Sequence, residues 1–335
     1  MKILYIGCHE ALEHDDLKLF LELGCEVFTT GEYLTNNNVY RNKIENLNID
    51  KDLKREWMHL KNANNNQGVY VKLTNRFLDN FDVIIVVHSI EWIILNESVF
   101  SGRNVILRTI GQNLPCNEQN IKKYKNLFRI VRYSAAERRL PSYAGEDALI
   151  RFYKDENEFK EWNGDLPQFI NFTRHLNSRM DFCQGNILVG LAKEIGLKIY
   201  GDNNEIISPL NSGKLDYEIL KMEMRNSRGY FYAGTKPASY TLNFMEAFMT
   251  GMPIVSIGSK LSSFMGLDLL EVPYIIRHGH SGFVSDNYEE IKKYCTQLIQ
   301  DKQMSKEISK NARASAFETF GKQKIKTKWK NFLGI

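Results

Sequence analysis

The order of apolar and polar positions divides the chain into two successive series of strands and helices. In the first series, short apolar runs predict strands at residues 2–6, 25–29, 81–87, 104–108 and 128–133. The run at 81–87 is nearly continuous, as in a parallel strand that is covered on both faces. A helix between the first two strands ends at Gly24. Residues 36–68 are polar and rich in asparagine apart from one amphipathic piece, which predicts a surface excursion.

The second series repeats this alternation. It predicts strands at 168–173, 198–200, 229–233 and 253–257, and helices at 187–195, 215–224, 241–250, 288–300 and 305–317. Two such series indicate an α/β chain with two Rossmann-like, doubly wound domains that face a cleft. We expect an N-terminal domain at 1–165, a C-terminal domain at 166–319, and a terminal helix at 320–335 that packs back toward the N-terminal domain. Ligands of such folds bind at the carboxyl ends of the strands.

Composition narrows the class of protein. The 335 residues are 43% hydrophobic and 25% charged, as in an ordinary soluble globular protein. The longest apolar stretch, residues 83–87, is too short to span a bilayer, so we expect no integral membrane segment. Five cysteines form no Cys-x-x-Cys pair, and an odd number favours a reducing compartment. We therefore expect a cytoplasmic protein.

Positive charge gathers at the C-terminus, where residues 302–335 carry nine basic and two acidic side chains. Lysines alternate there with Ile325 and Trp329, which stand four residues apart and would share one apolar stripe of a helix. The pattern predicts a docking helix with a solvated basic face. A surface that attracts polyanions is the alternative.

The stretch at 239–256 combines a polar helix start at Thr241, a carboxylate at Glu246 and a glycine stop at Gly251. Free backbone N–H groups near Thr241 would suit a phosphate. Glu246 could then reach the hydroxyls of a ribose attached to that phosphate. A solvated helix glutamate behind a simple cap is the alternative that spacing alone leaves open.

This stretch resembles the "EAMACGxPVV" signature of GT-B glycosyltransferases, particularly retaining glycosyltransferase family 4, and residues 272–286 resemble the "hGxxGfLv" turn that follows it. The resemblance covers about residues 168–320. It implies transfer of a sugar from a nucleoside diphosphate sugar to an acceptor hydroxyl of a glycan intermediate or small metabolite, with Glu246 binding the ribose. A UDP-sugar is the expected donor substrate, with no permanent cofactor and no metal.

Further positions of the nucleotide-sugar side follow from the same resemblance. The family places cations after the first strand of this domain to neutralise the donor diphosphate, and Arg174 and Arg179 stand there. Guanidinium groups suit phosphate oxygens. Gly201 closes the strand at 198–200. Gly7 begins a turn that resembles the family's loop beside donor and acceptor.

The acceptor side is expected in the N-terminal domain. His9 and Glu10 lie in the turn after the first strand, and His88 with Glu91 follows the strand at 81–87 as an acid/base pair for catalysis. Core or surface roles for His88 and Glu91 stay open. The acceptor-side candidates also include two residues near the position of the family's histidine, Arg108 and Gln112.

Two departures leave the donor sugar and the stereochemical outcome open. Ala238 stands where the family has an acid, and Ile110 precedes Gly111 where a His-Gly pair is usual. The "TLxxxE" start of the helix also resembles phage DNA glucosyltransferases, so hydroxymethylated DNA bases are an alternative acceptor. A nucleotide-sugar epimerase or a non-catalytic nucleotide-sugar-binding protein are further alternatives. GxGxxG, P-loop and GxSxG motifs are absent from the sequence, which argues against dinucleotide oxidoreductases, P-loop enzymes and serine hydrolases.

Overall fold

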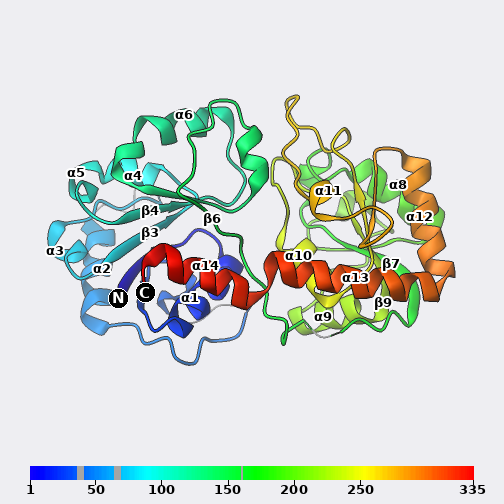
Figure 1. The fold of residues 1–335 in the computed structure, drawn as a ribbon, viewed down its shortest axis with the longest axis horizontal. Coiled ribbons are helices and arrows are strands. Elements are labelled where there is room, and N and C mark those ends of the chain that lie inside the picture. Colours follow the sequence, from blue (N-terminus) through cyan, green and yellow to red (C-terminus); the bar gives the residue numbers. More distant parts are fainter. Residues whose placement is uncertain (36–40, 64–68, 160) are drawn as a thin grey trace. The chain divides into compact units, whose positions relative to one another are not determined.

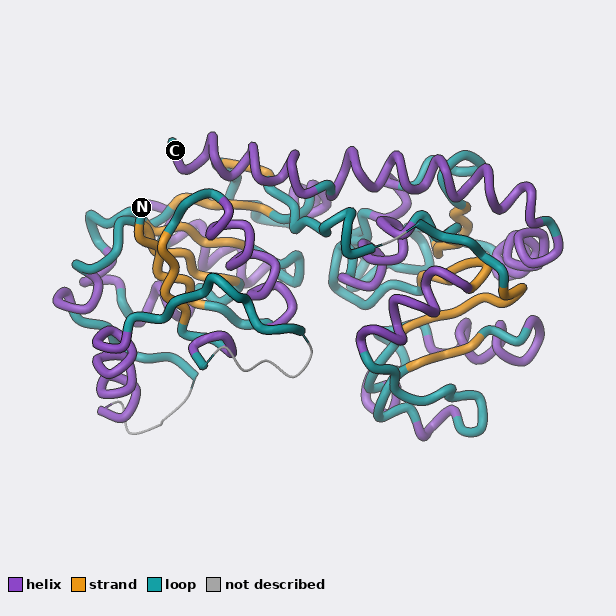
Figure 2. Tube along the Cα trace, turned by 90° about the horizontal axis from the view of Figure 1, so that it is seen from below, coloured by secondary structure: helices purple, strands orange, loops and turns teal. Residues whose placement is uncertain are grey.

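A computed structural model describes residues 1–35, 41–63, 69–159 and 161–335 (Figure 1). The chain divides into two compact units. Unit 1 comprises Met1–Phe152 and Lys326–Ile335, and unit 2 comprises Tyr153–Ile325. Each unit is built on one parallel sheet, and Figure 2 shows the strands of each sheet lying between helices. The predicted α/β class with two doubly wound sheets is confirmed.

The sheet of unit 1 has the strand order β2-β1-β3-β4-β5-β6, with every pair parallel. Its strands are β1 (Lys2–Ile6), β2 (Glu26–Thr29), β3 (Val83–Val87), β4 (Val105–Arg108), β5 (Arg129–Arg132) and the two-residue β6 (Ala148–Leu149). The first five are the strands that the sequence predicts. Because the chain leaves β1 to one side for β2 and returns on its other side as β3, the winding reverses there.

The helices of unit 1 include α1 (Glu10–Glu22), α2 (Lys51–Ala63), α3 (Asn75–Leu78), α4 (Glu91–Leu95), α5 (Glu97–Phe100) and α6 (Pro115–Lys123). One of them, α2, lies in the segment that the sequence predicts as a surface excursion. Leu53 and Trp57 of α2 are buried in the core together with Phe77. The amphipathic piece of 36–68 is therefore part of the core, because two apolar side chains four residues apart form one inward stripe. Residues 36–40 and 64–68 of that segment lie outside the described residues.

The sheet of unit 2 has the order β11-β10-β9-β7-β8, again parallel throughout. Its strands are β7 (Leu166–Phe172), β8 (Lys198–Tyr200), β9 (Ser227–Tyr232), β10 (Ile254–Ile257) and β11 (Phe283–Ser285). Its helices are α7 (Leu176–Arg179), α8 (Gly185–Ile195), α9 (Tyr217–Asn226), α10 (Leu242–Thr250), α11 (Val272–Ile275), α12 (Tyr288–Gln300) and α13 (Lys302–Phe320). The winding reverses between β7 and β9.

The boundary between the units falls after Phe152, before the position near residue 165 that composition suggests. Backbone hydrogen bonds explain the difference. The N–H of Lys154 donates to the carbonyl of Phe320 at 3.0 Å, and that of Trp162 donates to the carbonyl of Thr250 at 3.0 Å. The segment before β7 is therefore held by unit 2.

The terminal helix α14 (Lys322–Leu333) has the predicted apolar stripe, since Ile325 and Trp329 are 1% and 0% exposed. Trp329 meets the ring of Phe20 edge-on, with 5.1 Å between centroids. Most of its lysines are engaged within the chain. Their partners are a carboxylate for Lys322 (Asp155) and Lys326 (Glu22), and a backbone carbonyl for Lys324 (Glu318) and Lys328 (Leu149). The alternative of a surface that attracts polyanions stays a prediction.

Among the described residues, none of the helices has both the length and the apolar character that crossing a membrane requires.

Candidate functional site

The carboxyl edge of the sheet in unit 2 is ordered by one buried amide. Asn204, 0% exposed, donates from Nδ2 to the carbonyl of Thr173 at 2.7 Å and accepts at Oδ1 from the N–H of Leu176 at 3.0 Å. These bonds join the loops that follow β7 and β8. A Cβ atom at Gly201 would lie 1.9 Å from the same Thr173 carbonyl oxygen, so only glycine fits there. Gly201 thus shapes the edge, and its contact with a nucleotide sugar stays a prediction.

Both predicted cations lie after β7, on the loop and short helix that this edge supports. Arg174 donates from Nε and Nη2 to the two carboxylate oxygens of Asp202, at 2.5 and 2.8 Å. This hydrogen bonding lowers the pKa of Asp202. The Arg174 side chain is 46% exposed, and Arg179, the last residue of α7, is half-buried. Contact of either guanidinium group with a donor diphosphate stays a prediction.

A third cation, which the sequence analysis missed, follows β9. The N–H of Lys236 donates to the carbonyl of Phe182 at 2.8 Å, which ties the loop after β9 to the connection between α7 and α8. Burial lowers the pKa of Lys236, although nearby Asp181 opposes the shift. The Gly-Thr-Lys run directly after a predicted strand was the available signal.

Helix α10 begins beside the end of β7. Asn243 in its first turn donates from Nδ2 to the carbonyl of Phe172 at 3.2 Å. Thr241 is the N-cap residue with extended backbone (φ −114°, ψ 165°), and its side chain accepts no capping hydrogen bond from the helix. The Thr241 hydroxyl therefore does not cap the first N–H groups of α10. A phosphate that binds at this helix end needs such N–H groups as hydrogen-bond donors.

Glu246, one turn further along α10, is not a solvated helix residue. Its side chain is 4% exposed, and Oε1 lies 2.8 Å from Nζ of Lys154, which is itself 1% exposed. The sequence analysis did not single out Lys154, because 92 residues separate the two side chains and no local pattern links them. The structure thus adds a buried cation to the predicted ribose-binding carboxylate.

In unit 1, the predicted residues gather at the carboxyl ends of β1 and β3, which are neighbours in the sheet. Gly7 follows β1, with His9 exposed as the N-cap of α1 and Glu10 half-buried as its first residue. His88 follows β3 with a left-handed backbone (φ 70°), which is strained for a side chain other than glycine. Because β1 and β3 are parallel neighbours, the loops that follow them lie at one edge of the sheet.

The ring of His88 is suited to proton transfer. Its Nδ1 is buried without a hydrogen-bond partner among the described residues, and burial lowers the pKa of His88. The imidazole is therefore neutral near pH 7. Glu91 is exposed and accepts from Oγ of Ser89 at 2.8 Å. Its charge opposes the lowering of the His88 pKa, so the two groups sense each other.

Arg108 is placed in the core rather than at a ligand surface. It is 0% exposed, and its Nη1 lies 2.9 Å from Oδ2 of Asp16, while its guanidinium stacks 4.0 Å from the ring centroid of Phe152. Burial raises the pKa of Asp16 to about 6, against the attraction of Arg108. As the last residue of β4, Arg108 points its side chain into the covered face of the sheet. We therefore assign it a structural role, while Gln112, exposed in the loop after β4, stays an acceptor-side prediction.

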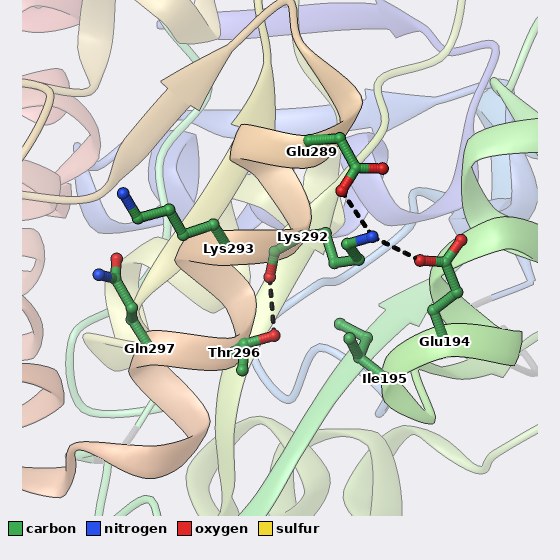
Figure 3. Close-up of a pocket in the computed structure, with 7 residues that line it drawn as sticks. All are labelled: Glu194, Ile195, Glu289, Lys292, Lys293, Thr296 and Gln297. Atoms are coloured by element: carbon green, nitrogen blue, oxygen red, sulfur yellow. Dashed lines mark hydrogen bonds and ion pairs between the residues drawn. The ribbon is translucent and has the colours of Figure 1, made fainter.

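One surface hollow of unit 2 lies elsewhere. It has a volume of about 690 Å³ and is lined by residues of α8 and α12 (Figure 3). Lys292 bridges Glu289 and Glu194 there, at 2.6 and 2.8 Å. Because α8 runs back before β8 begins, Glu194 and Ile195 at its end lie toward the amino ends of the strands. The hollow is therefore distinct from the edge that carries the cations.

No cluster of three or more histidine, cysteine or carboxylate side chains suited to a metal ion occurs within the part of the chain that the structure describes.

Comparison with known proteins finds a close likeness in structure only. No protein-family model matches the chain, and no curated protein sequence matches it significantly. Among solved structures, Anabaena HepE in complex with UDP-glucose matches with a TM-score of 0.69 at 15% identity, covering 100% of this chain and 99% of that one. Sucrose-phosphate synthase from Thermosynechococcus elongatus matches with a TM-score of 0.68 at 10% identity, over 99% and 98% of the two chains. A glycosyltransferase from Rickettsia africae also gives 0.68, at 15% identity over 99% and 98%.

These likenesses extend over the whole chain and over nearly the whole of each matched protein. The two parallel sheets of this chain and their flanking helices therefore constitute a GT-B fold, as the resemblance of the second half predicts.

Proposed function

We propose that the protein is a GT-B glycosyltransferase that moves a sugar from a nucleoside diphosphate sugar, a UDP-sugar above all, to an acceptor hydroxyl. The observation that carries the proposal is the full-length likeness to HepE, which was solved with UDP-glucose, together with a cationic edge in the corresponding fold. A GT-B fold by itself does not define an activity, so the residues at this edge carry the chemical argument.

In the proposed complex, unit 2 holds the donor. Arg174 and Arg179 neutralise the diphosphate, Thr241 presents the start of α10 to it, and Glu246 accepts hydrogen bonds from the ribose. Breaking the glycosidic bond leaves negative charge on the departing diphosphate. Cations and helix N–H groups that are already oriented stabilise that charge without reorganising, which lowers the barrier.

In unit 1, His88 is the proposed acid/base group for the acceptor hydroxyl. A buried Nδ1 and a lowered pKa keep its imidazole neutral and able to accept a proton. Glu91 would stabilise the imidazolium that forms. His9, Glu10 and Gln112 remain the proposed acceptor-side contacts, and the acceptor class remains a glycan intermediate or a small metabolite.

The proposal includes no permanent cofactor, no metal requirement and a cytoplasmic location, as the sequence analysis expects. Modified DNA is the alternative acceptor, with weaker support: two of the lysines that suggested a polyanion surface pair with carboxylates of the chain, Asp155 and Glu22.

Incubation with UDP-glucose, UDP-galactose and UDP-N-acetylglucosamine, with and without EDTA, tests the proposal. We expect UDP release that rises when a glycan or small-molecule acceptor is added, and a new glycosylated product detectable by mass spectrometry. A Glu246→Ala variant should lose most of this activity while keeping its circular dichroism spectrum. Conversion of the sugar without transfer would indicate an epimerase, and donor binding without turnover under every condition would indicate a binding protein; either result would contradict the proposal.

A further inference from the structure

The pair formed by Lys154 and Glu246 is the strongest feature of unit 2 that the proposed function does not yet use. Both groups are almost fully buried, at 1% and 4% exposure, and Nζ lies 2.8 Å from Oε1. A buried carboxylate without a counter-charge is costly, and breaking such a pair by removing one partner typically costs several kcal/mol. The position of Lys154 next to Glu246 of α10 therefore matters for stability, and neighbouring segments of unit 2 fix it.

The backbone around Lys154 provides that support. Its N–H donates to the carbonyl of Phe320 at 3.0 Å, and its backbone forms a parallel bridge with Gly321. A Cβ atom at Gly321 would lie 2.5 Å from the Phe317 carbonyl oxygen, so glycine allows residue 321 to lie this close to the last turn of α13. Lys322, directly afterwards, pairs with Asp155 at 2.9 Å. The segment that carries Lys154 is thus fixed to the end of α13 and the start of α14, at the lysine and at the residue that follows it.

The surroundings of the ammonium group are apolar. The ring centroid of Phe159 lies 5.7 Å from Nζ. On α10 and α13, which flank the segment of Lys154, Phe244 and Phe320 pack edge-on against each other. In such surroundings the attraction between the two charges is stronger than in water. Lys154 therefore orients the carboxylate of Glu246.

We propose that Lys154 is a positioning residue for nucleotide recognition, which holds Glu246 oriented to accept hydrogen bonds from the ribose hydroxyls. This inference rests on the proposed function. A carboxylate has about four acceptor sites on its two oxygens, so an ammonium group on one oxygen leaves capacity for a diol. Hydrogen bonds to an ionised acceptor are about twice as strong as neutral ones, so Lys154 would set how strongly the protein prefers ribose over deoxyribose.

The test measures the affinities of UDP and 2′-deoxy-UDP by titration calorimetry. For the wild type we expect UDP to bind about tenfold more tightly, because one hydrogen bond to a charged group is worth about 1.5 kcal/mol or more. Glu246→Gln should reduce that preference to about twofold or less. Lys154→Met should reduce it similarly, while Lys154→Arg, which keeps the charge, should restore most of it. Lys310→Met, which removes an exposed lysine of α13, is the matched control and should keep the wild-type preference.

The double variant Lys154→Met with Glu246→Gln guards against misfolding of the single variant. It leaves no uncompensated buried charge, and its ribose preference should equal that of Glu246→Gln alone. A purely structural Lys154 would weaken both ligands equally and leave their ratio unchanged, which would overturn the proposal. Tighter UDP binding by Lys154→Met with the preference for ribose retained would also overturn the proposal. Lys154 would then be a group that competes with the ligand for Glu246. Failure of the wild type to bind either nucleotide would instead contradict the proposed function itself.

Discussion

Arginines near the ends of strands are buried in unit 1 and partly exposed in unit 2. In unit 1, Arg108 and Arg132 are the last residues of β4 and β5, and both are 0% exposed. In unit 2, Arg174 stands two residues beyond β7 and is 46% exposed. A side chain within a strand points into a face that helices cover, whereas one in the following loop lies at the edge of the sheet. A shift of two residues along the chain, from the end of a strand into the following loop, thus distinguishes a buried arginine from an exposed one.

The carboxylates show the same contrast. Glu118 in unit 1 receives two hydrogen bonds from Arg132, at 2.6 and 2.7 Å, with neither side chain exposed. Asp202 in unit 2 receives a similar fork from Arg174, but its side chain is 27% exposed. Water competes for the hydrogen bonds of the exposed pair, Arg174–Asp202, and not for those of the buried pair, Arg132–Glu118. The two pairs therefore contribute differently to stability although their geometry is similar.

The largest effect that separates the two units is expected from Arg132→Met. Removing the guanidinium leaves Glu118 buried without a counter-charge, so we expect the free energy of unfolding to fall by about 3–5 kcal/mol in urea denaturation. Adding Glu118→Leu should recover part of that loss, because the buried charge of Glu118 is then removed, whereas Asn113 and the Ala144 N–H lose their acceptor. A stability loss below about 1 kcal/mol for Arg132→Met would show that the buried pair contributes no more than a surface pair.

Joint substitution of Arg174→Ala and Arg179→Ala should act on binding instead of stability. We expect the affinity for UDP to fall about 10- to 100-fold, since each arginine contributes charge-assisted hydrogen bonds to the diphosphate. Affinity for uridine should hardly change, and calorimetry of both ligands gives the ratio. Arg138→Ala, which removes another exposed and ion-paired arginine in unit 1, serves as the control. Equal losses for UDP and uridine would contradict the diphosphate role.

The buried carboxyl of Glu137 predicts a pH dependence that comes from unit 1. Burial raises the pKa of Glu137 to about 7, against the attraction of Arg132, from an ordinary value of 4.5. Because the folded state keeps this proton more tightly, the stabilising contribution is complete below about pH 4.5 and is lost as the pH rises through about 7. The contribution is at most about 3 kcal/mol. Unfolding free energies of Glu137→Gln between pH 5 and 8 should fall less steeply than those of the wild type, and parallel curves would refute the assignment.

The smallest effect is expected from Asp202→Ala. An exposed ion pair contributes about 0–1 kcal/mol, so the unfolding free energy should change by less than about 1 kcal/mol. UDP affinity should be maintained, because Arg174 loses a competing carboxylate and keeps its own charge. A loss of UDP affinity as large as that of the double arginine variant would mean that Asp202, and not Arg174 itself, organises the site.

The fold was predictable because its signals are local. Continuous apolar runs such as 81–87 predict covered parallel strands, and glycine stops such as Gly196 predict helix ends. The role of α2 was less accessible, because a polar segment hides the single stripe of Leu53 and Trp57 that enters the core. The two-residue strand β6 has no periodicity that could reveal it.

The candidate site was predictable only where residues follow a strand directly. Arg174 and Thr241 could be placed at the sheet edge from their order along the chain. The burial of Arg108 and the pairing of Glu246 with Lys154 depend on contacts across 92 residues in both cases, between Asp16 and Arg108 and between Lys154 and Glu246. Such pairs leave no local pattern. The sequence therefore offers each arginine, lysine or glutamate as a ligand, and only the fold shows which of them are buried against an opposite charge.

The central claim is that the carboxyl edge of unit 2 binds a nucleoside diphosphate. A thermal-shift measurement with UDP, GDP and ADP and their glucose conjugates, without added metal, tests it most directly, because a ligand of the native state raises the melting temperature by mass action. The account predicts a saturable rise with the uridine compounds that Glu246→Ala diminishes. A folded wild-type sample whose melting temperature rises with none of these nucleotides would contradict it.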